Sequence, residues 1–379
     1  MKTNHLAFCE SALLWTVETI EALVRLESPT GDKAAVDACG AHITGLLREI
    51  GGAIRVLPGA TAGDHLLAEF GSGGRQILVL GHIDTVWPVG ELARRPLRRA
   101  DHRLYGPGAF DMKAGIVLAI VALRALQDST PGLPGRVALL LTSDEETGSA
   151  TSRRFIEDLA RRSTAVLVLE PPLPGGALKT ARKGCGEFHL RVIGKPAHAG
   201  IEPERGVSAI RELARQVLAI EDLQDATRGT TLSVGIVRGG TRSNVIPAEA
   251  EAIIDVRAAT LDDADRVTRA MLALQPQIAG AAISVSGGID RPPFERTAAV
   301  EALFRHAQAV AARLGRTLDE GSTGGGSDGN LTAALNVPTL DGLGAIGAGA
   351  HGLDEYVEIP ELPWRAALVA GLIERILTR

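Results

Sequence analysis

The chain has 379 residues, a length that suits two domains better than one. Hydrophobic residues make up 45% of the chain but aromatic residues only 3%, so we expect a core of Ala, Leu, Val and Ile side chains. A net charge of −5, without a basic stripe or stacking aromatic residues, argues against a nucleic-acid-binding protein.

The sequence gives no sign of membrane insertion or secretion. No segment approaches the roughly 20 uninterrupted apolar residues of a membrane span, and residues 1–10 lack the apolar region of a signal peptide. The three cysteines, Cys9, Cys39 and Cys185, form no CxxC or similar cluster, which is typical of reduced, buried thiols. We therefore expect a soluble, cytoplasmic protein.

Strands and helices alternate over residues 10–180, the pattern of an α/β fold with a mostly parallel sheet covered by helices. Polar residues follow several of the strands at their carboxyl ends, where open α/β sheets bind ligands. In chain order we expect helices at 11–25 and 34–50, strands at 65–70 and 76–81, a helix at 113–127, a strand at 136–142, a helix at 149–161 and a strand at 165–169.

His82 and Asp84 end the apolar strand at 76–81. Residues two apart on a strand point to the same side, so the Asp84 carboxylate can hold one imidazole nitrogen of His82 while the other faces a metal. A histidine with a purely structural hydrogen bond is the alternative. Asp111 lies just before an apolar helical stretch, where an N-cap is the alternative to a metal ligand.

Glu145 and Glu146 follow the strand at 136–142, directly after Asp144. Adjacent carboxylates repel one another and usually mark a solvated turn or a helix start. This interpretation explains Asp144 well, but it does not explain why the acids adjoin a fully apolar strand. A cation would relieve the repulsion, and one glutamate could bind it while its neighbour transfers protons.

Glu170 follows the apolar strand at 165–169, and His351 lies in the Gly-rich turn 347–352. Two histidines and three to four carboxylates, each at a strand end or in a loop, form the ligand set expected for a paired-metal hydrolase.

The pattern changes near residue 178, where a β-α-β-β-α-β order begins that describes a compact split-βαβ unit. We place this unit at residues 178–291, as an insertion into a discontinuous catalytic domain made of residues 1–177 and 292–379. The expected elements are strands at 187–193, 231–237, 249–257 and 282–286 and helices at 203–223 and 261–274, followed by a helix of the first domain at 297–314.

The chain resembles the co-catalytic zinc peptidase family that includes glutamate carboxypeptidase, succinyl-diaminopimelate desuccinylase, acetylornithine deacetylase and aminoacylase. The motifs follow the family's order from about residue 10 to the C-terminus. The glutamate carboxypeptidases are most similar, through Leu169–Pro171, Gly324–Asp328 and His351–Val357. The resemblance implies a zinc-peptidase catalytic domain with an inserted ferredoxin-like lid domain, which in many members forms the homodimer.

By this resemblance Asp111 bridges two zinc ions, for which Co²⁺ or Mn²⁺ can substitute. His82 and Glu170 would complete one site, and Glu146 and His351 the other. The family also implies a non-proline cis peptide bond after Asp111.

Two more residues would serve the chemistry. A metal-bridging hydroxide would attack the scissile carbonyl, with Glu145 as the general base and Asp84 orienting His82.

The resemblance also assigns residues to the substrate. His198 would reach the active site of the partner subunit and donate to the oxyanion, and Asn244 would reach across as well. The residues around His198, taken alone, instead favour a hairpin-like connection in which the histidine is incidentally exposed. Lys179 and Arg291 match residues that bind substrate carboxylates, although surface charges at a hinge are an equal alternative. Gly326 lies in a Gly-rich segment without the Lys-Ser/Thr ending of a phosphate loop, so we expect it to line the substrate.

The leading hypothesis is therefore a zinc-dependent exopeptidase that releases C-terminal glutamate from N-acyl or N-aroyl glutamates, folates among them. An N-acyl-amino-acid deacylase of the acetylornithine deacetylase or desuccinylase type is the alternative with the same chemistry. A non-catalytic metal-binding homologue is the alternative of another class, and the intact Glu145 argues against it.

Overall fold

The computed structural model describes residues 4–59, 61–129, 132 and 134–378. The first of two compact units comprises Met1–Ala181, Arg296–Thr323 and Ser327–Arg379, and the second comprises Arg182–Glu295 and Gly324–Gly326. The second unit thus begins and ends a few residues later than the sequence suggests and includes Gly324–Gly326, which we had assigned to the first domain. Among the described helices, none combines the length and apolar content needed to cross a bilayer.

The main sheet of the first unit is built around β2 (His65–His82) and β5 (Pro134–Thr142). Leu141 has a partner in each half of β2, Leu66 and Gly81, so β5 lies between the two halves. The second half of β2 runs parallel to β5 and to β6 (Ala165–Val168), and β6 runs parallel to β13 (Thr339–Leu340). At the other edge, β1 (Ala53–Leu57) is antiparallel to β2. This arrangement confirms the expected α/β fold.

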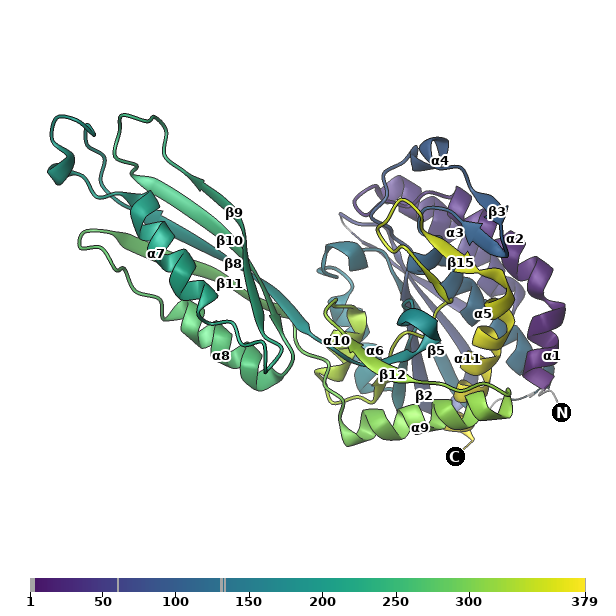
Figure 1. The fold of residues 1–379 in the computed structure, drawn as a ribbon. Coiled ribbons are helices and arrows are strands. Elements are labelled where there is room, and N and C mark those ends of the chain that lie inside the picture. The colour runs from purple at the N-terminus through teal and green to yellow at the C-terminus, as the bar shows by residue number, and fades with distance from the viewer. Residues whose placement is uncertain (1–3, 60, 130–131, 133, 379) are drawn as a thin grey trace. The chain divides into compact units, whose positions relative to one another are not determined.

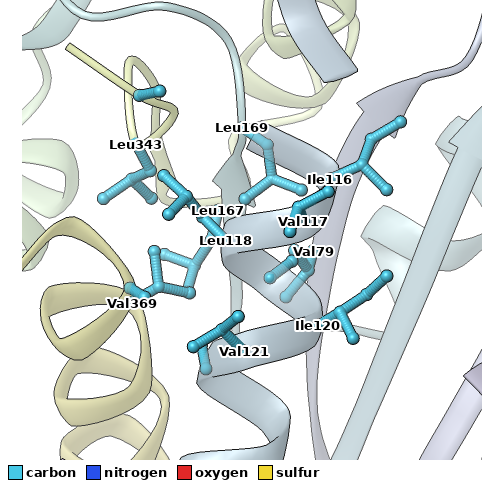
Figure 2. Packing of buried hydrophobic residues seen from close by; sticks show 14 of the residues in the cluster. Val79, Ile116, Val117, Leu118, Ile120, Val121, Leu167, Leu169, Leu343 and Val369 are labelled. Atoms are coloured by element: carbon cyan, nitrogen blue, oxygen red, sulfur yellow. The ribbon is translucent and has the colours of Figure 1, made fainter. Parts of the chain in front are cut away.

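Helices cover both faces of this sheet, because successive strand residues point to opposite sides. Val79 packs with α5 (Ala114–Ser129) and α11 (Leu362–Leu377) in one apolar cluster, part of which is shown in Figure 2. Leu78 and Leu80 pack on the other face with α6 (Arg153–Arg161) and α10 (Asp328–Ala333). The α5 helix is buried on nearly all sides, as its uniformly apolar sequence indicates.

The first unit contains further helices and a small second sheet (Figure 1). The sheet has the antiparallel order β14-β15-β4-β3 and joins segments that are distant in sequence. Its strands are Arg98–Ala100 (β3), Arg103–Tyr105 (β4), Gly347–Ala348 (β14) and Tyr356–Glu358 (β15). The remaining helices are Asn4–Ser11 (α1), Leu13–Arg25 (α2), Lys33–Glu49 (α3), Glu91–Arg94 (α4) and Ala298–Arg313 (α9).

The second unit has the expected split-βαβ order and forms an antiparallel sheet with the ferredoxin-like order β11-β8-β10-β9. Phe188, Leu190 and Val192 alternate toward the two helices, while the residues between them are exposed. The elements are Gly184–Ile193 (β8), Ala209–Glu221 (α7), Thr231–Gly239 (β9), Glu249–Ala258 (β10), Leu261–Leu272 (α8) and Ala282–Arg291 (β11).

Some expected bounds are wrong. Helix α7 begins at Ala209 instead of 203, because Pro203–Arg205 form a separate turn and Ser208 caps the helix by accepting from Arg211 N. Residues 178–181 stay with the first unit, because β7 (Leu178–Arg182) pairs with β12 (Glu320–Thr323). Cys185 is only half-buried, whereas Cys9 and Cys39 are buried as expected.

Candidate metal and catalytic site

The carboxyl ends of three neighbouring parallel strands meet at one edge of the main sheet, and candidate residues follow each of them. His82 ends β2, and Glu145 and Glu146 lie in a short 3-10 turn that begins three residues after the end of β5. Glu170 lies two residues after β6. Strand pairing therefore brings these four side chains into one region.

Two further candidates lie in turns attached to the small sheet. Asp111 lies between β4 and α5, and the Asp111–Met112 peptide bond is cis, as the resemblance implies. His351 lies in the turn between β14 and β15. Because β15 pairs with β4, the turns that carry Asp111 and His351 are held close together.

The two imidazoles share one carboxylate. His82 Nε2 lies 3.3 Å from Asp111 Oδ1 and 3.5 Å from Glu170 Oε1. His351 Nε2 lies 3.4 Å from Asp111 Oδ2 and 3.2 Å from Glu146 Oε2. Each oxygen of Asp111 thus faces a different histidine, and each histidine faces one further glutamate.

The proton on His82 can be assigned from its other nitrogen. His82 Nδ1 lies 2.9 Å from the backbone oxygen of Asp84. A carbonyl oxygen only accepts hydrogen bonds, so Nδ1 carries the proton in the neutral ring and Nε2 directs a lone pair at Asp111 and Glu170. This tautomer suits a cation placed between the imidazole and the carboxylates.

The electrostatics also favour bound positive charge. Burial opposes charge on His82, yet the carboxylates of Asp111, Asp84 and Glu170 raise its pKa well above the usual range. Hydrogen bonds to Asp111 and Glu146 raise the pKa of His351 to about 10. In addition, Asp111 Oδ1 and Glu146 Oε1 are buried and have no hydrogen-bond partner among the described residues. Such oxygens suit metal coordination.

Glu145 lies beside these residues. Ligand atoms of His82, Glu145 and Glu170 all lie within 4.8 Å of one another, and so do those of His82, Asp111 and Glu146. The structure thus gathers all of the proposed ligands and the proposed base within the first unit.

Asp84 holds the turn that carries the two glutamates. Its Oδ1 accepts from Glu145 N at 3.3 Å and its Oδ2 from Glu146 N at 3.2 Å. Thr30 Oγ1 donates to Oδ2 at 2.7 Å, and the carboxylate is fully buried. Asp84 Oδ1 is 3.5 Å from His82 Nδ1, so the closer partner of the imidazole is the Asp84 backbone.

The sequence analysis did not identify two buried residues that support the site. Glu355 accepts from backbone N–H groups of the Asp111 turn. Arg365, on α11, donates to the backbone oxygens of Gly344, Gly176 and Gly342. Gly344 N in turn donates to the Glu170 backbone oxygen at 2.9 Å. In the sequence, Arg365 is signalled only as a charge within an apolar segment, and Glu355 only as a residue of the motif His351–Val357.

The residues assigned to substrate carboxylates are not surface charges. Lys179 lies in β7 of the first unit and is 8% exposed, and its backbone pairs with Asp341. Arg291 ends β11 of the second unit and is 6% exposed. Burial of this extent argues against the alternative of solvated hinge charges. Gly326, also in the second unit, accepts from Arg182 Nη1 through its backbone oxygen.

His198 and Asn244 are brought together within the second unit. Ala199 N donates to the Asn244 backbone oxygen at 3.0 Å, and His198 forms an antiparallel bridge with Val245. Gly200 N donates to His198 Nδ1 at 3.2 Å, so a neutral His198 carries its proton on Nε2. Both His198 and Asn244 are exposed.

Comparison with known proteins agrees with this geometry. A model of Peptidase family M20/M25/M40 matches residues 78–375. Carboxypeptidase G2 of Pseudomonas sp. (strain RS-16) is 32% identical over 365 residues, which cover 94% of this chain and 88% of that protein. Succinyl-diaminopimelate desuccinylase of Thioalkalivibrio sulfidiphilus is 29% identical over 332 residues, covering 83% of this chain and 87% of that protein.

The fold is also similar to a solved structure, the YXEP protein of Bacillus subtilis, described as a dinuclear metal-binding peptidase of the M20 family. The two share a TM-score of 0.73 and 17% identity over 97% of this chain and 99% of that one. The chain therefore belongs to Peptidase family M20/M25/M40 and is a hydrolytic enzyme of the peptidase and amidohydrolase kind.

Proposed function

We propose that the chain is a zinc-dependent exopeptidase that hydrolyses the amide bond to a C-terminal glutamate, with N-acyl and N-aroyl glutamates, folates among them, as substrates. The observation that carries the proposal is the sharing of Asp111 between two imidazoles, each of which faces a second carboxylate. The likeness to carboxypeptidase G2 supports a carboxypeptidase activity.

The donor set fits two metal ions. His82, Glu170 and one oxygen of Asp111 would hold the first, and His351, Glu146 and the other oxygen of Asp111 the second. Imidazole and carboxylate ligands suit zinc, and Co²⁺ or Mn²⁺ could replace it. When bound, such ions polarise the scissile carbonyl and lower the pKa of water.

The protein's own groups supply the proton transfers. We assign Glu145 as the general base, which takes a proton from the attacking water and passes it to the leaving amine. Its nearness to His82 and Glu170 supports this role. Asp84 accepts from the backbone N–H of Glu145 and so fixes the segment that carries the base.

We also propose three residues for substrate binding. Lys179 and Arg291 would bind the two carboxylates of the glutamate, which a guanidinium and an ammonium group suit well. Gly326 would line the substrate. In support, both charged side chains are almost fully buried, so neither is a solvated surface charge.

The second unit would serve as a lid that forms a homodimer and carries His198 and Asn244 to the partner's active site. In support, the proton on His198 Nε2 is available to the oxyanion that forms as water attacks. One such hydrogen-bond donor typically lowers the activation barrier by ~3–4 kcal/mol. The edge strand β9 also exposes Ile236 and Val237, at 43% and 56%, without Pro or Lys to prevent pairing. Sedimentation of Val237→Lys should show a monomer with little activity, and a fully active monomer would contradict the role of His198.

The likeness to succinyl-diaminopimelate desuccinylase favours a second candidate, an N-acyl-amino-acid deacylase with the same chemistry and another pocket. The test is amino-acid release by metal-stripped protein, with and without zinc, from N-benzoyl-glutamate, folate, N-acetylornithine and N-succinyl-diaminopimelate. Zinc-dependent glutamate release from the first two supports the proposal. Activity on the last two alone supports the deacylase, and no activity on any contradicts both.

Lys179→Ala and Arg291→Ala sharpen this test. Both should lose activity selectively on substrates with an acidic C-terminal residue. Arg94→Ala is a matched control, because this side chain is 78% exposed and, among the described residues, its ion pair is with Glu91.

A further inference from the structure

Glu355 is a buried carboxylate that the proposed chemistry does not use. It lies four residues after His351 and is 2% exposed. We propose that Glu355 is a positioning residue that sets the geometry of the metal centre, an inference that rests on the proposed function.

The carboxylate is saturated by four N–H donors. Glu355 Oε1 accepts from Phe110 N at 2.9 Å and Asp111 N at 3.0 Å. Its Oε2 accepts from Gly108 N at 2.8 Å and Trp87 Nε1 at 2.9 Å. Three of these donors are backbone groups of the turn that carries Asp111, so the carboxylate fixes the path of that turn.

These bonds join three segments that carry site residues. Trp87 lies three residues beyond Asp84 in the loop that follows β2, and Asp111 belongs to the turn before α5. Glu355 itself belongs to the His351 segment, and its backbone oxygen accepts from Gly106 N at 3.2 Å. One side chain therefore ties together the segments of His82, Asp111 and His351.

Only a carboxylate can make all four bonds. An ionised carboxylate accepts through both oxygens, whereas a glutamine amide accepts through one and presents N–H donors at the other. In Glu355→Gln, one pair of N–H groups would face another donor in a buried place. The Asp111 turn would then shift or lose partners, although no proposed ligand has been changed.

The test is zinc affinity, measured on metal-stripped protein by competition with a chromophoric chelator, together with zinc content after dialysis. Glu355→Gln should weaken zinc binding by about 10- to 100-fold, the range found when groups that hold metal ligands are replaced. Added zinc should restore part of its activity, which a general loss of folding would not allow. Trp87→Phe removes a single donor and keeps an aromatic ring, so it should weaken zinc binding by a smaller factor.

Glu358→Gln is the matched control. It lies on the strand that follows Glu355 and is partly exposed, and its side chain pairs with Arg103 at 3.9 Å and with no other side chain that the structure describes, so zinc affinity should not change. Wild-type zinc affinity in folded Glu355→Gln would overturn the inference. If that variant does not fold, wild-type affinity in Trp87→Phe would overturn it instead. A wild-type protein that binds no zinc would contradict the proposed function itself.

Discussion

Gly115 lies at the contact between two segments that carry proposed metal ligands. It lies in the first turn of α5, four residues after Asp111, and packs against the backbone of Leu169, which precedes Glu170. A Cβ at this position would lie 2.4 Å from the Leu169 oxygen and 3.1 Å from Met112 Cε. The distance between α5 and Leu169 would have to grow by 1.0 Å, from 2.4 to the 3.4 Å of an ordinary contact.

Gly115→Ala should therefore affect activity more than stability. Overpacking costs about 1–3 kcal/mol, but alanine recovers about 1 kcal/mol of helix propensity, so we expect a loss of only ~0–2 kcal/mol in the free energy of unfolding. A displacement of about 1 Å between Asp111 and Glu170 should lower kcat/KM on N-benzoyl-glutamate roughly 100-fold.

Gly45→Ala is the matched control, because Gly45 lies in α3 and a Cβ added there would meet nothing within 4 Å. It should gain about 0.5–1 kcal/mol in urea unfolding and keep full activity. The steric reasoning is refuted if Gly115→Ala behaves like Gly45→Ala in both assays.

Three further predictions concern other residues of the first unit. Glu145→Gln should lower kcat about 10²- to 10⁴-fold with unchanged zinc content by atomic absorption, and a loss of zinc would instead make Glu145 a ligand. Arg365→Met leaves three buried carbonyl oxygens without a donor, so urea unfolding should show a loss of about 3 kcal/mol or more; an unchanged midpoint would contradict this. Burial lowers the pKa of His65, so the unfolded chain binds its proton more readily and the stability that neutral His65 provides is lost as the pH falls below about 6.5. The stability of wild type relative to His65→Asn should therefore fall by at most about 1.4 kcal/mol per pH unit between pH 7 and 5, and a difference independent of pH would refute this sign.

The sequence predicts the elements of the fold well where the hydrophobic pattern of a segment is clear. The apolar runs before His82, Glu145 and Glu170 are strands, because side chains buried on both faces of a parallel sheet need no polar alternation. The short strands β3, β4, β14 and β15 are not predictable in this way. Each has two or three residues and is defined by a partner distant in the chain.

The residues of the candidate site likewise fall into those that the sequence predicts and those that only the fold reveals. His82, Glu146 and Glu170 are found from strand ends alone, since the ends of parallel strands meet. That Asp111 lies between the two histidines depends on the pairing of β4 with β15, which only the fold reveals. Glu355 was visible as a residue of the family motif, but its role depends on four N–H donors from two other segments.

The most direct test of the metal centre is anomalous diffraction at the zinc absorption edge from crystals of zinc-reconstituted protein. We expect two peaks about 3.5–4 Å apart with Asp111 between them, one beside His82 and Glu170 and the other beside Glu146 and His351. A single peak, or peaks away from Asp111, would contradict the two-metal site on which the proposed hydrolysis depends.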